Sequence, residues 1–552
     1  MTSALGFEIP SDPTMWIVTV LAGVAIFFTY NFLFAFGPDK TKDGLSFPPE
    51  PPGKHWLWGH APLLPNDGTH FDLKFLEMAQ QMNNASVFTV QLPIFKRMII
   101  VADPDIIHHI TVSKNYHKSW TYKFLIFGPQ SIVRTHGDEW LVQRKTFVFG
   151  FTPTYLKDMV TTMCSKLERY LKVLDQDATN ARTPASDMLH RAQIFTSDVI
   201  VQVALGEDWG DSYDEKSDFL ENIGNPYLAG FGNKQTSKLM EARSWLNEMA
   251  FLSNALMSHP LTYIFGFAER QRLKELTKQV NELFGDVLER RLNEFKTDEG
   301  KMDVPAGKDI CSLAIATMKK GSGGKTFSLT PEEKINVIEQ LKTFYFAGND
   351  TTATTIAWAS WLLSQHPEVM TKLRKELDQK NIFKGFKNDN AIEGLAKNGP
   401  TYDQLNDCPY LDAVIKETLR LYPPASTGRY VADPEESYNN QYKLGGAVLY
   451  VNPFIMHRLP QYWENPNDFQ PDRFVGLTSD MYSHKFLPFS KGKRDCLGKY
   501  FAMIEAKLAV AALVQRYDMT CYDEKETVGT RITSYPIGGA KVYLTLRSSS
   551  GK

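Results

Sequence analysis

The sequence predicts a mainly α-helical fold with a small β-sheet region, an α+β fold, for the part of the chain that follows its first fifty residues. Three observations support this class. Apolar residues recur near helical spacing from Lys499 to Tyr517. A helical pattern runs without a break from Thr330 to His366. Two short alternating segments, Ser86–Leu92 and Met98–Val101, predict strands of one sheet.

Length and composition favour one large globular domain. Of the 552 residues, 43% are hydrophobic, and no internal repeat or long low-complexity segment divides the chain after the first fifty residues. The formal net charge of −2 gives no general attraction to nucleic acid, so we expect no such partner. The five cysteines are dispersed and include no C-x-x-C pair, which argues against a disulfide scaffold and a zinc site and favours a reducing compartment.

An uncharged run near the start of the chain predicts a membrane anchor over residues 1–37, with a transmembrane helix at about 15–36. Such a helix would be roughly 33 Å long, enough to cross a bilayer core. Glu8 and Asp12 precede the run, whereas a cleaved secretory signal would begin with basic residues. Lys40 and Lys42 follow it, so the rest of the chain should lie in the cytosol.

The proline-rich segment 38–53 cannot continue a helix and predicts a stiff, extended hinge. The globular domain would then occupy residues 54–552. Further along, Trp140 and Arg144 have the i,i+4 spacing that puts an indole N–H and a guanidinium on one helix face, where both could bind one carboxylate. The alternative is an aromatic ring packed beside a surface arginine.

The long helical pattern begins at Thr330 as N-cap, with Glu333 completing a capping box, and would extend for roughly 50 Å. Its middle reads Ala347-Gly348-Asn349-Asp350-Thr351-Thr352, mostly residues of poor helix propensity. A buried carboxylate and hydroxyl are costly unless paired or functional, so this segment suggests a site. Gly348 removes bulk, and the Thr351 hydroxyl could interrupt the backbone ladder and open a groove for oxygen or water. The alternative is a kinked or partly exposed helix segment.

Glu417 and Arg420 are spaced i,i+3 on an otherwise apolar helix, close enough for a salt bridge. Later in the chain, the segment Pro471-Asp472-Arg473-Phe474 offers a second arginine. Pairs of this kind are common and contribute little when they lie on a surface.

The most specific motif is F-x-x-G-x-R-x-C-x-G, from Phe489 to Gly498. Its cysteine, Cys496, lies where a helix begins, and the positive end of that helix would stabilise a thiolate. Gly492 and Gly498 can adopt backbone angles closed to other residues and let the chain lie close to a flat cofactor. Arg494 supplies positive charge for acidic groups. The alternative is a buried free cysteine before a core helix.

With this loop the sequence resembles the cytochromes P-450, the haem-thiolate monooxygenases, of the membrane-anchored microsomal type. The resemblance implies the P-450 fold, haem b as cofactor and Cys496 as the axial iron ligand. It also implies three groups of site residues. Those that bind the cofactor are Trp140, Arg144, Gly348, Arg429, Phe489, Arg494, Cys496 and Gly498, with the arginines and Trp140 at the propionates. The proton relay for O–O cleavage is Asp350 and Thr351. The buried network for folding and haem retention is Glu417, Arg420 and Arg473.

The resemblance further implies monooxygenation of a hydrophobic organic substrate, such as a lipid, a terpenoid or a polyketide-like secondary metabolite. The sequence contains no G-x-G-x-x-G fingerprint for a dinucleotide. Electrons would therefore come from NADPH through a separate NADPH–cytochrome P-450 reductase in the endoplasmic reticulum membrane, and cytochrome b5 is a second partner that the resemblance allows. Lysines around Cys496 predict a basic docking face: Lys145, Lys491, Lys493 and Lys499.

Three other functions fit parts of the pattern. A haem-thiolate isomerase or dehydratase would need no external electrons, and the intact Asp350-Thr351 pair argues against it. A non-catalytic haem protein for electron transfer or sensing would show no ligand-induced spectral shift. An anchored scaffold without a cofactor would be colourless.

Overall fold

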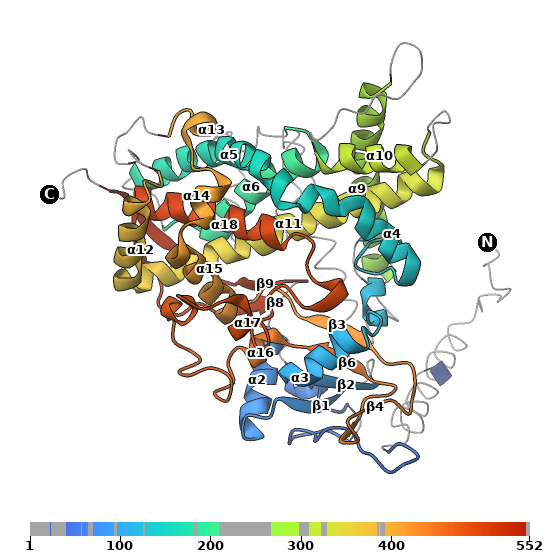
Figure 1. Cartoon of the computed structure of the whole chain (residues 1–552). Helices are drawn as coiled ribbons and strands as arrows, with labels where there is room; N and C mark the ends of the chain where they lie inside the picture. The colour runs from blue at the N-terminus through green and yellow to red at the C-terminus, as the bar shows by residue number, and fades with distance from the viewer. Residues whose placement is uncertain are drawn as a thin grey trace.

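The computed structural model describes residues 22–23, 40–56, 58–64, 70–92, 96–124, 127–179, 185–208, 267–296, 309–321, 328–383, 386, 392–530 and 532–547. Helices dominate these residues, and the largest sheet lies at one end of them (Figure 1). The α-helices are α2 (Phe71–Gln81), α3 (Pro104–His108), α4 (Gly137–Phe147), α5 (Pro153–Thr179), α6 (Met188–Ile200), α9 (Phe267–Glu294), α10 (Ile310–Gly321), α11 (Pro331–Gln365), α12 (Pro367–Gln379), α13 (Leu395–Asn398), α14 (Tyr402–Asn406), α15 (Pro409–Leu421), α16 (Pro453–Met456), α17 (Ser479–Tyr482) and α18 (Lys499–Arg516).

Shorter helical turns and strands connect these helices. The turns are η1 (Ala61–Leu63), η2 (His109–Ser113), η3 (Trp120–Phe124), η4 (Val148–Phe151), η5 (Val201–Leu205), η7 (Pro471–Phe474) and η8 (Gly492–Arg494). The strands are β1 (Val87–Leu92), β2 (Lys96–Val101), β3 (Thr427–Tyr430), β4 (Ser437–Tyr438), β5 (Tyr442–Lys443), β6 (Val448–Val451), β7 (Tyr517–Cys521), β8 (Val528–Thr530), β9 (Ser534–Pro536) and β10 (Val542–Leu546).

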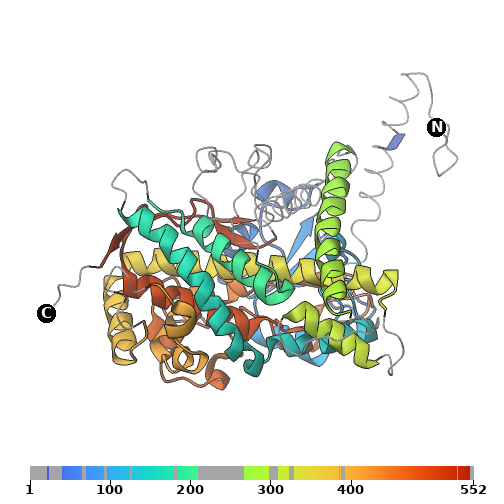
Figure 2. The same cartoon turned by 90° about the horizontal axis from the view of Figure 1, so that it is seen from above.

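Helix α11 crosses the whole width of the molecule (Figure 2). The predicted capping box is confirmed: the Thr330 hydroxyl accepts from the Glu333 backbone N–H at 3.2 Å, and the Glu333 carboxylate accepts from the Thr330 backbone N–H at 2.8 Å. The helix ends one residue before His366, as the following proline requires. Because most of its residues are buried, packing stabilises it more than propensity does.

Helices α6 and α11 cross at very close range. A Cβ atom added to Gly348 would lie 2.8 Å from both Cγ1 and Cδ1 of Ile200. Beside this crossing the Thr196 hydroxyl lies 2.9 Å from the backbone oxygen and the side-chain oxygen of Asn349. The glycine of the long helix is therefore needed for helix packing, whatever else it contacts.

The main sheet joins two segments that are far apart in the sequence, residues 87–101 and 427–451, with strand order β1-β2-β6-β3 (Figure 1). Strand β2 pairs antiparallel with β1 and parallel with β6, where Ile99 lies opposite Leu449. Strands were predicted at residues 86–92 and 98–101, and both are confirmed within two residues. The sheet places Arg429 on β3, with its backbone paired to Leu449 and bridged to Lys118.

Part of the expected hinge lies against this sheet. The carbonyl oxygens of Pro48 and Pro49 accept hydrogen bonds from the Thr89 hydroxyl and the Thr89 backbone N–H, each at 2.8 Å. Prolines lack an N–H but keep their carbonyl as acceptor, so the segment docks on β1 instead of standing free of the domain. Within the described ranges no helix is long and apolar enough to cross a bilayer. The expected anchor helix at 15–36 lies outside those ranges except for Ala22 and Gly23.

The α6–α11 crossing predicts that Gly348→Ala lowers the melting temperature, because overpacking by one methyl group costs about 1–3 kcal/mol. The control is Gly285→Ala in α9, whose added Cβ would lie 3.6 Å from Ile338 Cδ1, an ordinary contact. That variant should be neutral or slightly stabilised. Ile200→Ala combined with Gly348→Ala should recover part of the loss. Equal effects of the two single glycine substitutions would contradict the packing argument.

Candidate functional site

The cysteine loop is closed by a backbone hydrogen bond and by one glycine. The Cys496 N–H donates to the Phe489 carbonyl oxygen at 2.9 Å. Gly492 has φ +81°, and a Cβ there would lie 2.4 Å from the backbone oxygen of Thr111, so both conformation and space require glycine. The loop thereby packs on η2 and leads directly into α18.

The second predicted glycine differs from expectation. Gly498 has φ −86°, which any residue can adopt, and an added Cβ would make only an ordinary 3.8 Å contact with Phe151. The expected unusual backbone angle is therefore wrong for Gly498. Its contribution is at the sulfur, because its backbone N–H hydrogen-bonds Cys496.

Cys496 lines an internal space. The residue is exposed, yet burial raises the pKa of its thiol, while the Gly498 N–H acts in the opposite direction. A side chain that solvent can touch while protein surrounds it lies on the wall of a hollow. The Gly498 N–H and the start of α18 favour a thiolate, and burial disfavours it unless a cation binds the sulfur.

Helix α11 presents a short open stripe within an otherwise buried region. Ala347 is exposed and Gly348 and Thr351 are partly exposed, although the residues on both sides are buried. The Thr351 hydroxyl donates to the Ala347 carbonyl oxygen at 2.7 Å. The helix continues through this segment, so the expected interruption of the ladder is not observed among these residues. The oxygen lone pairs of Thr351 are still available to accept a hydrogen bond.

Asp350 and Thr351 take different partners although they are adjacent in sequence. The buried Asp350 carboxylate accepts from Gln193 Nε2 at 3.0 Å and from the Thr533 hydroxyl. These partners belong to α6 and to the turn between β8 and β9. The Asp350 carboxylate therefore connects α11 to two other segments, whereas the Thr351 hydroxyl bonds within its own helix.

Three cations meet beside the cysteine loop without a carboxylate among them. Arg429 is fully buried; its Nη1 donates to the Tyr116 carbonyl oxygen at 3.2 Å, and its Nε and Nη2 have no partner among the described residues. Arg494 Nη2 donates to the Thr135 carbonyl oxygen at 2.6 Å, and Nη1 likewise has no described partner. Lys118 donates to the Thr427 hydroxyl at 2.7 Å.

The pKa values of this group show how strongly it needs a counter-ion. Burial, and then repulsion from Arg429 and Arg494, lowers the pKa of Lys118 to about 8. Burial and repulsion from Arg429 lower the pKa of Arg494 to about 10. Burial, its stacked neighbour His117 at 4.5 Å and the same cations lower the pKa of His136 to about 4. Buried unpaired charge is unfavourable, so an anionic ligand would stabilise this cluster.

Trp140 and Arg144 reach the same loop from α4. The Arg494 guanidinium lies over the Trp140 ring at 4.6 Å from its centroid, and Arg144 lies 5.7 Å from it. Arg144 is paired with Asp495, donating to its carboxylate at 2.6 Å and to its carbonyl oxygen at 2.9 Å. Trp140 therefore borders the unpaired cations, whereas Arg144 fastens α4 to the cysteine loop.

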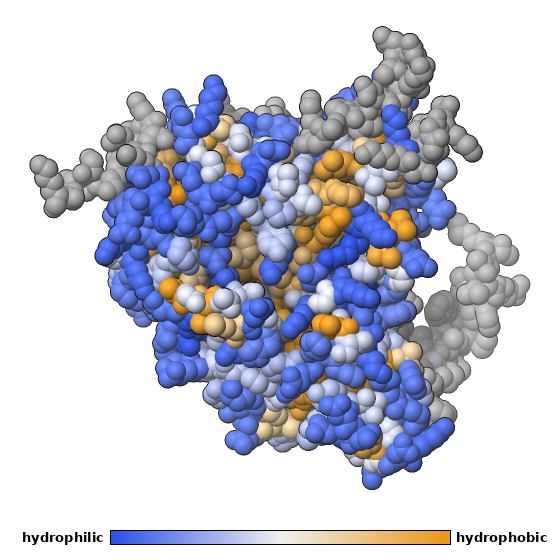
Figure 3. All heavy atoms as spheres, in the orientation of Figure 1, coloured by the Kyte–Doolittle hydropathy of each residue, from blue (hydrophilic) through white to orange (hydrophobic). Residues whose placement is uncertain are grey.

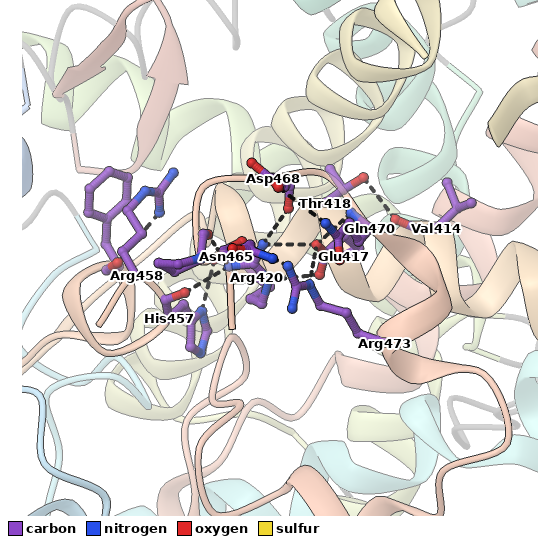
Figure 4. Close-up of polar contacts among 12 residues, drawn as sticks. Val414, Glu417, Thr418, Arg420, His457, Arg458, Asn465, Asp468, Gln470 and Arg473 are labelled. Carbon is purple, nitrogen blue, oxygen red and sulfur yellow. Dashed lines mark hydrogen bonds and ion pairs between the residues drawn. The ribbon is translucent and has the colours of Figure 1, made fainter. Parts of the chain in front are cut away.

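The expected ion-pair network is present as contacts (Figure 4). Glu417 and Arg420 are fully buried and lie 2.7 Å apart, and Arg473 lies 3.2 Å from Glu417. Arg420 also donates to three backbone carbonyl oxygens, those of His457, Pro466 and Asp468. The network joins α15 to the segment that runs toward the cysteine loop.

Sequence reasoning did not identify Lys118, Tyr122 and His136. The Tyr122 hydroxyl lies 3.1 Å from Thr427 Oγ1 and 3.4 Å from Lys118 Nζ. These residues come from η3 and irregular segments, where no periodic pattern marks them. The backbone bridge between Lys118 and Arg429, flanked by hydrogen bonds from Ser119 to Gly428 and from Tyr430 to His117, brings this segment to β3.

Comparisons with known proteins identify the family. The family model described as Cytochrome P450 matches residues 48–536. The chain belongs to the cytochrome P-450 family. Cytochrome P450 4A14 of Rattus norvegicus is 27% identical over 486 residues, covering 86% of this chain and 84% of that protein. Cytochrome P450 4V2 of Homo sapiens is 25% identical over 503 residues, covering 89% and 88%.

Two further relatives extend the comparison. Secologanin synthase 2 of Catharanthus roseus is 27% identical over 442 residues, covering 76% of this chain and 73% of that protein. Among solved structures, the haem domain of a mutant cytochrome P450DA matches with a TM-score of 0.70 and 20% identity, covering 91% of this chain and 98% of that chain. The P-450 fold, with its mainly helical architecture and small sheets, is confirmed.

Membership in this family makes the chain a haem-b-dependent monooxygenase. The residues present fit that cofactor on observations of this structure. Cys496 offers a sulfur ligand at the wall of an internal space, and haem carries two propionates that would neutralise the unpaired cations Arg429, Arg494 and Lys118. Ala347, Gly348 and Thr351 form an accessible stripe in an otherwise buried stretch of α11.

The unpaired cations predict opposite effects of one substitution on two forms of the protein. Arg429→Met should raise the melting temperature of the haem-free chain, because it removes a buried charge with two unpaired nitrogens. The same change should lower haem occupancy after purification, since a propionate would lose a cation. Both quantities are measured by thermal unfolding and by the absorbance ratio of haem to protein.

The control for that prediction is Arg374→Met. Arg374 donates to the carbonyl oxygens of Val514 and Tyr517, at 3.0 and 2.7 Å, and so lacks unmet donors of this kind. It should lower the melting temperature of the haem-free chain and leave haem occupancy unchanged in the folded fraction. A haem-free chain destabilised by Arg429→Met would contradict the charge argument.

Proposed function

We propose that this monooxygenase is anchored in the endoplasmic reticulum membrane and takes electrons from NADPH through a separate reductase to oxidise a hydrophobic organic substrate. The observation that carries the proposal is the accessible sulfur of Cys496, held at the start of α18 beside buried arginines whose nitrogens have no described partner. The cationic cluster beside the loop supports it, because this cluster lacks the anion that haem would supply.

Each site residue receives a role in this proposal. When bound, haem with a thiolate ligand supplies the activation of dioxygen. Cys496 would bind the iron, and the hydrogen bond from the Gly498 N–H stabilises the negative charge on its sulfur. Arg429 and Arg494 bind the propionates, with Trp140 alongside; Lys118 is added to this set. Phe489 and Gly348 border the cofactor, and Arg144 positions the loop through Asp495.

Thr351 accepts and donates the proton that the reaction requires, and its hydroxyl must turn from the Ala347 carbonyl to donate elsewhere. Asp350 would take up a proton from water and pass it toward Thr351, while the hydrogen bonds donated by Gln193 and Thr533 hold its carboxylate in place. Glu417, Arg420 and Arg473 act in folding and haem retention. Their ion pairs and hydrogen bonds join α15 to residues 457–473, so we assign them a structural role and no chemistry.

The chain divisions remain those predicted from the sequence: an anchor at 1–37, a hinge at 38–53 and the haem domain at 54–552. The hinge residues from Lys40 to Pro49 contact the domain, because Lys42 donates to Glu435, Ser46 accepts from Lys443, and Pro48 and Pro49 accept from Thr89. Lipid, terpenoid and polyketide-like molecules are the proposed substrate classes. The family resemblance implies that a segment within residues 158–295 covers the substrate, and residues 209–266 of it lie outside the described residues.

The ligand assignment predicts that Cys496→Ala abolishes the thiolate-type absorption band of the reduced carbon-monoxide complex. The variant should also lose turnover that depends on NADPH and reductase. The wild-type protein is tested in parallel with an organic hydroperoxide and no reductase. Peroxide rearrangement without any NADPH-dependent product would favour the isomerase or dehydratase alternative and would overturn the proposal.

The proton role predicts that Thr351→Ala uncouples the reaction, so that NADPH is consumed with little product and more hydrogen peroxide. General acid–base assistance contributes on the order of 10²-fold or more, and the ratio of product to NADPH should fall by at least several-fold. Thr351→Ser should retain coupling. The control is Thr355→Ala, which removes a buried hydroxyl that donates to the Thr351 carbonyl oxygen at 2.9 Å. Unchanged coupling in Thr351→Ala would remove the proposed role.

The face around the cysteine loop fits a redox partner with an acidic surface. Exposed lysines Lys145, Lys493 and Lys499 surround it, and Lys491 is partly exposed. Hydrophobic side chains gather over α4 on the same face (Figure 3), with Val142 65% exposed. The neighbouring exposed apolar residues are Val112, Leu141, Phe149 and Tyr500. An apolar centre with a basic rim suits a transient interface with a flavin-carrying reductase domain.

This surface predicts that Lys145→Glu together with Lys499→Glu raises the apparent KM for the reductase by roughly tenfold or more, mainly at low ionic strength. The control is Lys525→Glu, an exposed lysine on the turn between β7 and β8. Substrate binding, followed by the spin-state shift of the Soret band, should be the same in all three proteins. Equal reductase kinetics in the double variant and the control would exclude this face as the docking site.

A further inference from the structure

A buried carboxyl group in α18 has no role in the site described above. Glu505 is fully buried, and neither of its carboxyl oxygens has a hydrogen-bond partner among the described residues. Thr352 on α11 is also buried, and its hydroxyl is without a partner in the same set. Unsatisfied buried groups of this kind are rare in native proteins and call for an explanation.

Thr352 behaves differently from Thr351 and Thr355 of the same helix. Thr351 and Thr355 each donate to the carbonyl oxygen four residues earlier, at 2.7 and 2.9 Å. The Thr352 hydroxyl makes no such bond. Helices α11 and α18 pack against each other, and there the Thr352 hydroxyl approaches the Glu505 carboxyl and counteracts the effect of burial on its pKa. The Thr352 hydroxyl and the Glu505 carboxyl therefore lie next to each other at the α11–α18 interface.

No cation pairs with the Glu505 carboxyl among the described residues. Burial raises the pKa of this carboxyl well above its usual range, and Thr352 provides the only opposing influence that the structure identifies. The cations of α18 lie elsewhere: Lys507 pairs with Asp412 at 2.7 Å, Arg516 pairs with Asp175 at 2.6 Å, and Lys499 is exposed. An ionised carboxylate would be strongly unfavourable here, whereas a neutral acid offers one donor and one acceptor to a hydroxyl.

We propose that Glu505 is a neutral carboxylic acid that hydrogen-bonds Thr352, and that this pair is a positioning contact between the cysteine helix and the helix that carries Thr351. Helix α18 begins directly after the cysteine loop, and Thr352 is the next residue after Thr351. The bond therefore fixes the rotation of α11 about its axis relative to the sulfur ligand. The kinetic part of this inference rests on the proposed function, and its structural part does not.

The protonation state is tested on the folded protein by infrared spectroscopy with isotopically labelled glutamate. The wild type should show the carbonyl stretch of a protonated carboxyl at neutral pH. That band should be missing in Glu505→Gln and shifted in Thr352→Val. A wild-type spectrum without the band, or a band indifferent to Thr352→Val, would overturn the proposal even if a Glu505 variant failed to fold.

Thermal stability against pH provides a second test that needs no turnover. The folded chain keeps the Glu505 proton at pH values where the unfolded chain, with a pKa of about 4.3, has released it. Wild-type stability should therefore fall relative to Glu505→Gln as pH rises, by up to about tenfold in the unfolding constant per pH unit. Parallel pH profiles of the two proteins would contradict a neutral acid.

Coupling distinguishes positioning from proton delivery. Glu505→Gln keeps one donor and one acceptor, so its ratio of product to NADPH should match that of the wild type from about pH 6 to about pH 8. Glu505→Leu and Thr352→Val remove the bond and should lower that ratio at least twofold while keeping the carbon-monoxide band. If Glu505→Gln were uncoupled like Glu505→Leu, the residue would be a proton donor and the inference would fail. Absence of NADPH-dependent turnover in the wild type would refute the proposed function and leave the spectroscopic result standing.

Discussion

The structure depends on one fully satisfied buried cation. The guanidinium of Arg420 donates five hydrogen bonds, two to the Glu417 carboxylate and three to backbone carbonyl oxygens, at 2.6–2.9 Å. A buried ion pair stabilises a fold only when such additional bonds complete it, and loss of one partner then leaves an uncompensated charge. Through these bonds α15 fixes the segment that leads toward the cysteine loop, so the position of the sulfur ligand follows from this arginine.

A second set of buried cations is left incomplete, and the contrast separates fold from cofactor site. Arg429 and Arg494 together leave three nitrogens without described partners, and Lys118 beside them has a pKa lowered to about 8. Repulsion within this cluster opposes folding of the haem-free chain, and a dianionic ligand removes the repulsion. Cofactor binding and folding are thus thermodynamically linked at these residues, whereas Arg420 is satisfied by protein atoms alone.

Much of this arrangement could be predicted from the sequence because it depends on local patterns. The capping box at Thr330, the helix around Glu417 and the loop before α18 follow from residue spacing, and the structure has each in place. Long-range contacts were not predictable in this way. Lys118 reaches Arg429 only through strand pairing, Ile200 fills the space left by Gly348, and Asp350 turns to Gln193. The glycines show the same limit, since Gly492 needs its positive φ and Gly498 does not.

The parallel pairing of β2 with β6 bears on how the chain matures on the ribosome. Strand β2 can pair with β1 as soon as both are synthesised. Its other edge stays uncovered until β6 is made, because Met98 pairs with Val448. An uncovered strand edge is a template for aggregation, and long-range pairing is slow. Because Cys496 is translated later still, haem can bind to it only after nearly the whole polypeptide has been synthesised. Chaperones that shield the nascent N-terminal hairpin would therefore set the yield of active enzyme in heterologous expression.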